Sequence, residues 1–236
     1  MEEIKIPEFK EKIVKNLDSL DEKPKKDFMK IFSVFDKHYI LGGFVRDSVL
    51  QILYDYEFPL NDLDILIDDN EFDKKIQKFP QKNKSRFGGL KLKYEGFEID
   101  LFGIKNVKFL DNLSDKEKNL ENVLKGCDVS TSSFAYDITN NKIYENGAMR
   151  DVNKKEINLK YNNKRKAATI CRLILHSDKM DFKLGDSARE YIKGNYLENP
   201  EKINKEIEEF AEYKNIEHTK DLIYNVIGSI TKKRIQ

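Results

Sequence analysis

Two aspartates separated by one residue are the first feature of this chain that could carry chemistry. Asp62 and Asp64 flank Leu63 at the start of an apolar stretch that ends at Ile67. Side chains alternate between the two faces of a β-strand, so both carboxylates would lie on one face and Leu63 on the other. Paired carboxylates suit Mg²⁺, which takes a few carboxylate oxygens together with water and phosphate oxygens.

The spacing alone is weak evidence, because it recurs at Asp55/Glu57, Glu71/Asp73 and Glu206/Glu208. Its surroundings are more unusual. Between Asp47 and Asp73 the chain has nine acidic residues and neither Lys nor Arg. They are Asp47, Asp55, Glu57, Asp62, Asp64, Asp68, Asp69, Glu71 and Asp73.

A glycine pair upstream predicts a phosphate site. Gly42 and Gly43 follow a short predicted strand, 39–41, and precede a predicted helix. Glycines let a backbone approach a ligand closely, and the free N–H groups of a helix start bind phosphate. Arg46 could fork onto phosphate oxygens while Asp47 holds it in place. An ordinary strand-to-helix turn with a surface Arg/Asp pair would explain the same residues.

A third carboxylate is expected on a neighbouring strand. The predicted hairpin joins strands 90–94 and 97–104, and its second strand places Glu98 and Asp100 on one face. A carboxylate there could help to activate an acceptor hydroxyl. A solvated acid on an edge strand is the alternative for Asp100.

Three ordered blocks resemble a known superfamily. The segments Leu41-Gly42-Gly43-Phe44-Val45-Arg46-Asp47 and Asn61-Asp62-Leu63-Asp64-Ile65 resemble the GGxVRD and DxD motifs of class II nucleotidyltransferases, the bacterial CCA-adding enzymes and poly(A) polymerases. The segment from Asp128 to Asp137 is similar to that family's RRDFTINALAY block. The resemblance covers about residues 39–176.

The resemblance implies a two-metal, Mg²⁺-dependent transfer of a nucleoside monophosphate from an NTP to a hydroxyl, with release of pyrophosphate. The implied metal ligands are Asp62 and Asp64, with Asp100 as a further candidate. The implied nucleotide-binding residues are Gly42, Gly43, Arg46, Asp128 and Arg172. An RNA 3′ end is the expected acceptor, with tRNA as one candidate. A toxin- or defence-type enzyme that modifies an RNA or a protein hydroxyl, and a binding module with a decayed site, stay open.

The chain also departs from the family pattern. Gly126 and Cys127 stand where the family has two arginines, and Ser132 replaces the usual Asn. In the stretch that corresponds to the base-reading segment, 162–172, only Arg172 is in register and no acid precedes it. We therefore expect weaker NTP selectivity than the family shows.

A basic stretch follows the third block. Residues 150–172 contain eight bases and two acids, a local charge of 8 − 2 = +6. Lys164, Arg165 and Lys166 are the predicted RNA contacts, and Tyr161 could stack on a base. A solvated helix face with a packed tyrosine explains these residues as well.

The resemblance implies an α+β fold. We predict a nucleotidyltransferase head over 1–150, with a helical N-terminal extension over 1–38 and a small mixed sheet flanked by helices. A helical neck or C-terminal domain should follow over 151–236. Pro24, Gly194 and Pro200 are the expected helix breaks.

Composition excludes several classes. The 236 residues contain 43 Lys and Arg against 42 Asp and Glu, so the chain is not a generally polybasic nucleic-acid binder. Two cysteines cannot form a disulfide framework or a zinc cluster, which favours a reducing cytoplasm. The apolar runs are far shorter than the ~20 residues of a membrane helix, and no secretory signal is recognisable. The resemblance implies NTP and RNA as partners, and the sequence predicts no membrane partner.

Overall fold

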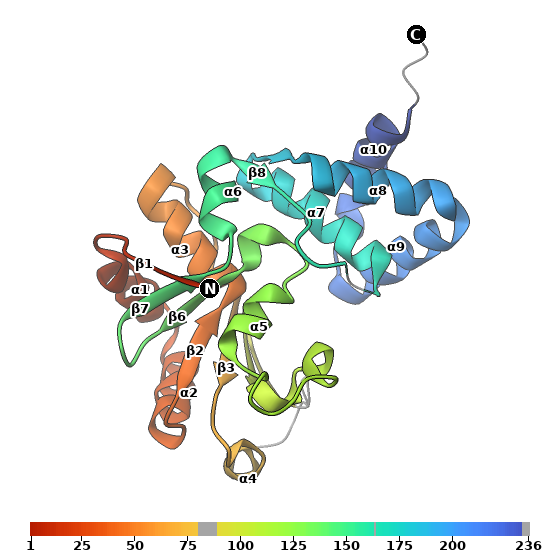
Figure 1. Ribbon diagram of the computed structural model, residues 1–236. Coiled ribbons are helices and arrows are strands. Elements are labelled where there is room, and N and C mark those ends of the chain that lie inside the picture. Colours follow the sequence, from red (N-terminus) through yellow and green to blue (C-terminus); the bar gives the residue numbers. More distant parts are fainter. Residues whose placement is uncertain (80–88, 163, 233–236) are drawn as a thin grey trace. The chain divides into compact units, whose positions relative to one another are not determined.

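The computed structural model describes residues 1–79, 89–162 and 164–232, and the chain forms two compact units. The first unit contains residues 1–126 and 132–146. The second contains residues 127–131 and the chain from 147 onward. Figure 1 shows the elements of both units.

A seven-stranded sheet forms the centre of the first unit, with the order β1-β7-β6-β2-β3-β5-β4. Only β3 and β5 run parallel, and every other neighbouring pair is antiparallel. This mixed sheet confirms the predicted α+β class. The strands are β1 (Glu2–Ile4), β2 (His38–Leu41), β3 (Asp62–Ile67), β4 (Leu90–Tyr94), β5 (Phe97–Gly103), β6 (Phe134–Asp137) and β7 (Lys142–Glu145).

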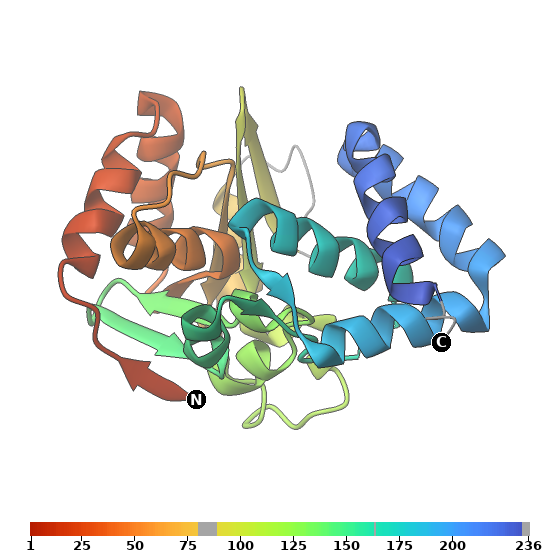
Figure 2. The same ribbon diagram turned by 90° about the horizontal axis from the view of Figure 1, so that it is seen from above.

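Helices cover both faces of this sheet (Figures 1 and 2). On one face lie α1 (Phe9–Asp18), α2 (Glu22–Val34) and α3 (Gly42–Tyr54), and Ile65 and Ile67 of β3 are buried. The opposite face carries Leu66 and Phe102 in a second cluster. The other members of that cluster are Tyr39, Leu41, Ile104, Val107, Leu110, Leu120, Val123, Leu124 and Ala135, partly from α5 (Leu120–Lys125) and two short 3₁₀ turns, Ile104–Asn106 and Lys108–Leu110.

One expected helix break in the first unit differs from the expectation. Pro24 does not break the N-terminal helical region but lies in the first turn of α2, where a missing N–H breaks no helical hydrogen bond. After β3 the chain forms α4 (Phe72–Lys75) and then the 3₁₀ turn Ile76–Lys78. Helix α5 begins at Leu120, after the N-cap Asn119, whose side chain accepts a hydrogen bond from the Asn122 N–H over 3.1 Å.

The second unit is mainly helical, as predicted. Its helices are α6 (Ala148–Lys154), α7 (Lys166–Met180), α8 (Asp186–Glu198), α9 (Pro200–Lys214) and α10 (Lys220–Thr231). Pro200 starts α9 as expected, but Gly194 lies inside α8 without breaking it. Two short parallel strands, β8 (Glu156–Ile157) and β9 (Lys183–Leu184), were not predicted. Among the described residues, no helix is long and apolar enough to cross a membrane.

Candidate active site

The backbone register brings the predicted carboxylates of the first unit onto one face of the sheet. Asp64 pairs with Leu41 of β2 on one side and with Asp100 of β5 on the other. Asp62 lies beside Glu98 in the same parallel ladder. Leu66 follows Asp64 on this face and belongs to the buried cluster under α5. On this face of the sheet, the carboxylates therefore form a polar region, and the hydrophobic core begins at Leu66.

The glycine turn lies directly against the carboxylate pair. Gly42 has a φ of +61°, a backbone conformation that only glycine adopts without strain. A Cβ built on Gly42 would lie 3.8 Å from Asp64 Oδ2. A Cβ on Gly43 would lie 3.8 Å from Asp62 Oδ1 and 3.5 Å from Arg46 Nη2. The structure thus brings the glycine turn, Arg46, Asp62 and Asp64 together.

Arg46 and Asp47 are not the surface pair that the alternative interpretation requires. Both are buried, at 3% and 5% exposure. The Nε and Nη2 groups of Arg46 each donate to Asp47 Oδ1 over 2.7 Å. This fixes the guanidinium with its Nη2 beside the glycine turn. Replacing only one member of a buried ion pair destabilises the fold, because the remaining charge stays buried without a partner.

A lysine that sequence reasoning missed faces the third carboxylate. Lys91 of β4 is opposite Asp100 in the antiparallel ladder, and its Nζ lies 3.8 Å from Asp100 Oδ2 and 2.8 Å from Glu98 Oε2. The hydrogen bond from Lys91, with a weaker contribution from Lys93, lowers the pKa of Glu98 below its usual range. The contact could have been predicted from the hairpin, because the register of its two strands places Lys91 opposite Asp100.

The carboxylate oxygens of the candidate site are of the right chemical type to bind a hard cation, but they are not arranged as a complete metal site. Asp62, Asp64 and Asp100 supply carboxylate oxygens on one face, the ligands that Mg²⁺ prefers. Across residues 1–79, 89–162 and 164–232, however, no three His, Cys, Asp or Glu side chains are arranged to hold a metal ion. The Asp62/Asp64 pair beside the glycine turn is therefore the core of the candidate metal site.

The predicted nucleotide residues of the second unit form a separate polar cluster. Asp128 is buried and makes an ion pair through Oδ2 with Arg172 of α7. Thr169 Oγ1 donates to the same oxygen over 3.2 Å, and the Val129 N–H donates to Oδ1 over 3.1 Å. Burial raises the pKa of the neighbouring Tyr191 hydroxyl. Its contact with Thr169 lowers this pKa, and the negative charge of Asp128 raises it. Sequence reasoning missed Thr169 and Tyr191, whose types carried no distinctive signal.

Packing explains one departure from the family motif. A Cβ on Gly126 would overlap with the ring of Phe109, whose side chain rests against the glycine backbone. An arginine at this position therefore requires Phe109 to move. Phe109 is 39% exposed despite being apolar.

The predicted RNA-binding residues lie at the start of α7. Lys164 and Arg165 are exposed, and Lys166 pairs with Glu198 of α8 over 3.0 Å. Tyr161 is 42% exposed. Asn163, in the middle of this stretch, lies outside the described residues. RNA contact here stays a prediction.

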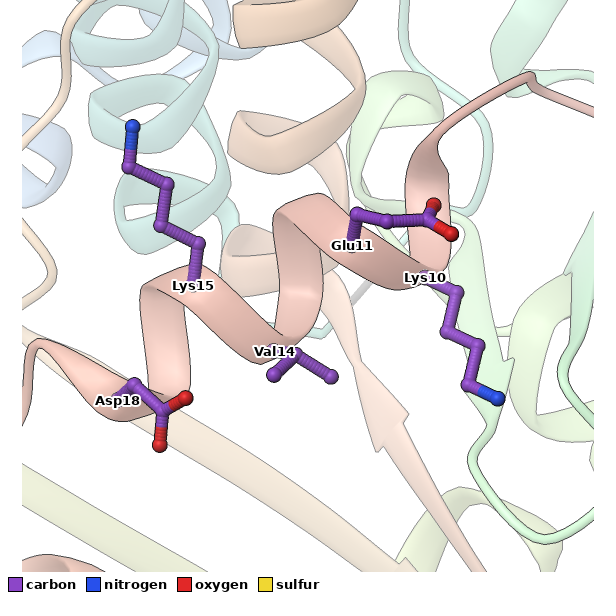
Figure 3. A pocket seen from close by; sticks show the side chains of 5 residues that line it. All are labelled: Lys10, Glu11, Val14, Lys15 and Asp18. Carbon is purple, nitrogen blue, oxygen red and sulfur yellow. The ribbon is translucent and has the colours of Figure 1, made fainter.

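The hollow in Figure 3 belongs to a different surface. It is lined by α1 residues of both charges and one valine: Lys10, Glu11, Val14, Lys15 and Asp18. None of the predicted site residues lines it.

The fold is similar to that of solved CCA-adding enzymes. A CCA-adding enzyme in complex with CTP superposes with a TM-score of 0.57 at 20% identity, covering 92% of this chain and 55% of that chain. The Thermotoga maritima CCA-adding enzyme complexed with tRNA gives a TM-score of 0.59 at 20% identity, with coverages of 92% and 53%. This chain has a CCA-adding enzyme-like fold. A tRNA-processing enzyme in an apo form matches with a TM-score of 0.51 at 19% identity, over 84% of this chain and 49% of that one.

The match is one of structure rather than of sequence. No protein-family model matches the chain, and no curated protein matches it significantly. The chain spans about half the length of the three solved structures named above.

Proposed function

We propose that this protein is an Mg²⁺-dependent nucleotidyltransferase of the cytoplasm that transfers a nucleoside monophosphate from an NTP to an RNA 3′ end, with tRNA as a candidate acceptor. One observation carries the proposal: the Asp62/Asp64 pair and the buried Arg46 converge on the glycine turn of α3. The nucleotidyltransferase-like fold supports it.

Each part of this constellation has a physical task. The backbone at Gly42 and Gly43 lets phosphate oxygens approach closely, and Arg46 offers a charge-assisted donor that Asp47 holds in place. Asp62 and Asp64 would hold Mg²⁺, with Asp100 beside them in register. Bound Mg²⁺ would neutralise charge that develops on the transferred phosphoryl group. Asp100 would orient or deprotonate the acceptor hydroxyl.

In this proposal, the second unit would supply the nucleotide and RNA contacts. Asp128 and Arg172 would contact the nucleoside, with Thr169 positioning the carboxylate. Lys164, Arg165 and Lys166 would bind RNA phosphates, and their contribution would fall with added salt.

A toxin- or defence-type enzyme that modifies an RNA or a protein hydroxyl is the second candidate. The altered nucleotide residues favour it: Phe109 packs where the family motif has an arginine, and Thr169 shares Asp128 with Arg172. Both candidates use the same carboxylate pair.

Transfer of label separates these possibilities. The protein is incubated with each α-³²P-labelled NTP, Mg²⁺ and total RNA, and label is followed in RNA and in protein. We expect RNA to be labelled by the wild type but not by Asp62→Asn or Asp64→Asn. Asp68→Asn is the matched control, since Asp68 belongs to the same acid run but pairs with Lys37 over 2.6 Å. Label in protein alone would favour the second candidate, and no label with any NTP would contradict both.

A further inference from the structure

One buried amide joins α1 to the helix of the glycine turn. The buried residues of α1 are Phe9, Ile13 and Asn16, so a polar side chain continues an otherwise apolar face. Asn16 is only 7% exposed, and its Nδ2 donates to Ser48 Oγ over 2.9 Å and to Gln51 Oε1 over 3.0 Å. An amide nitrogen has two hydrogens, so these two bonds use its full donor capacity.

Ser48 connects this contact to the first turn of α3. Its side chain is fully buried, and its Oγ donates to the C=O of Phe44 over 2.8 Å while it accepts from Asn16. Phe44 directly follows the glycine pair, and Arg46, two residues later, has its Nη2 beside Gly43. Two successive hydrogen bonds therefore lead from α1 to the part of α3 that the proposed function assigns to the triphosphate.

These hydrogen bonds define the position of α3 more exactly than apolar packing can. Burial of apolar surface between α1 and α3 is non-directional and sets no exact spacing along the helix axis. An N–H···O bond requires about 2.7 to 3.2 Å, so a slide of α3 by one residue, about 1.5 Å, would break both bonds of Asn16. The glycine turn would move by the same distance relative to Asp62, whose Oδ1 lies only 3.8 Å from a Cβ built on Gly43.

We propose that Asn16 is a positioning residue for the candidate triphosphate site. It holds α3 at the axial position that places the glycine turn and Arg46 beside the candidate metal ligands, and it acts through Ser48 rather than by contact with substrate. The inference rests on the proposed function and deepens it, because the helical N-terminal extension predicted over 1–38 would then contribute to substrate binding.

Binding of inorganic tripolyphosphate with Mg²⁺, measured by calorimetry on the full chain, tests this role without a base or an RNA acceptor. We expect Asn16→Leu to bind about tenfold more weakly than the wild type. The double variant Asn16→Leu/Ser48→Ala replaces both buried partners with apolar side chains, so its stability in urea should recover relative to Asn16→Leu. Its tripolyphosphate binding should stay as weak as in the single variant. Binding that recovers together with stability would overturn the proposal, because the amide would then only stabilise the fold.

Ile13→Val is the matched control. Ile13 is 1% exposed on the same face of α1, and its truncation weakens packing while both bonds of Asn16 remain. We expect its tripolyphosphate binding to stay within about twofold of the wild type. An equal loss of binding in Ile13→Val and Asn16→Leu would overturn the positioning role.

Steady-state kinetics separate this inference from the proposed reaction. In Asn16→Leu the KM for NTP should rise about tenfold and kcat should stay within about threefold, because the triphosphate donors bind ground state and transition state alike. A wild type that binds tripolyphosphate but transfers no label would contradict the proposed reaction and leave the positioning role standing. Normal transfer by the wild type with an unchanged KM in Asn16→Leu would overturn the positioning role alone.

Discussion

Asp64 of β3 and Asp100 of β5 lie side by side in a parallel ladder, with their side chains on the same face of the sheet. Two residues further along each strand, Leu66 and Phe102 enter the buried cluster under α5. The two carboxylates are therefore carried by strands that hydrophobic packing holds in place. Positioning on rigid strands is what a reaction that depends mainly on geometry and electrostatics requires.

The two glycines of the turn should respond differently to alanine. Gly42→Ala forces a side chain into the left-handed region at φ +61°, which should cost about 1 to 2 kcal/mol of unfolding free energy. Gly43→Ala adds a Cβ at ordinary contact distances from Arg46 and Asp62, so the fold should be nearly unaffected. Its methyl group occupies the space beside the candidate triphosphate donor, so KM for NTP should rise. Urea unfolding and steady-state kinetics together check this pair, and equal stability losses would contradict it.

Lys91 should compete with Mg²⁺ for the carboxylate face. Its ammonium group lies 3.8 Å from Asp100 Oδ2, so Lys91→Met removes a positive charge from the neighbourhood of the metal ligands. We expect half-maximal activity at a lower Mg²⁺ concentration, by a factor of about three to ten. Lys93→Met is the control, since Lys93 pairs with Glu98 over 3.5 Å and is 59% exposed. A Mg²⁺ titration in which both variants behave alike would show that Lys91 does not act on the metal.

His38 should make the first unit sensitive to mild acid. Its ring packs 3.7 Å from the ring of Phe32, between centroids, and burial lowers its pKa below 6.5. The Phe35 backbone and the charge of Asp137 only partly oppose this effect. The unfolded chain therefore takes up a proton that the folded chain resists as the pH falls below about 6.5. Stability is full above that pH and is lost below it, by at most about 1.4 kcal/mol per pH unit.

His38→Leu isolates this effect. The variant loses or gains packing by an amount that does not depend on pH, so the slope of unfolding free energy against pH is the informative quantity. Between about pH 6.5 and pH 5.5 the variant should have a shallower slope than the wild type. Parallel slopes in urea unfolding would exclude His38 as the titrating group.

NTP selectivity should be weak. Arg172 is engaged by Asp128, which Thr169 also holds, so the pair presents little net charge to a base edge. Triphosphate contacts at Gly43 and Arg46 should then dominate, and the four NTPs should compete within about tenfold, or roughly 1.4 kcal/mol. Competition assays with labelled and unlabelled NTPs measure this range. A preference of several hundredfold would reveal a base-reading group, and Arg165 and Arg172 would be the first to substitute.

Local patterns predicted most strands of the sheet. The hairpin of β4 and β5 was recognisable from alternating residues around Glu95 and Gly96, and β4 has the predicted bounds. The three-residue β1 was missed because it exists only through pairing with β7, as at Glu2 and Glu145. Gly194 was a poor break signal because tertiary packing of α8 outweighs about 1 kcal/mol of helix propensity.

The sequence predicted those parts of the candidate site that follow from a motif together with the alternation of side chains along a strand. Asp62 and Asp64 share a face through strand alternation, and the neighbouring position of Asp100 follows once β3 and β5 are paired. Their parallel pairing could not be read from local sequence, because it depends on strands 30 residues apart meeting in space. The burial of Arg46 and the pairing of Thr169 with Asp128 likewise depend on tertiary packing.

In the proposed reaction, the Asp62/Asp64 pair drives transfer to an RNA 3′ hydroxyl. The most direct measurement compares incorporation of α-³²P-labelled nucleotide, with Mg²⁺, into intact RNA and into the same RNA whose 3′ end has been oxidised by periodate. We predict labelling of the intact RNA with release of pyrophosphate, no labelling of the oxidised RNA, and a loss of at least about a hundredfold in Asp64→Asn. Equal labelling of both RNAs, or full activity in Asp64→Asn, would contradict the account.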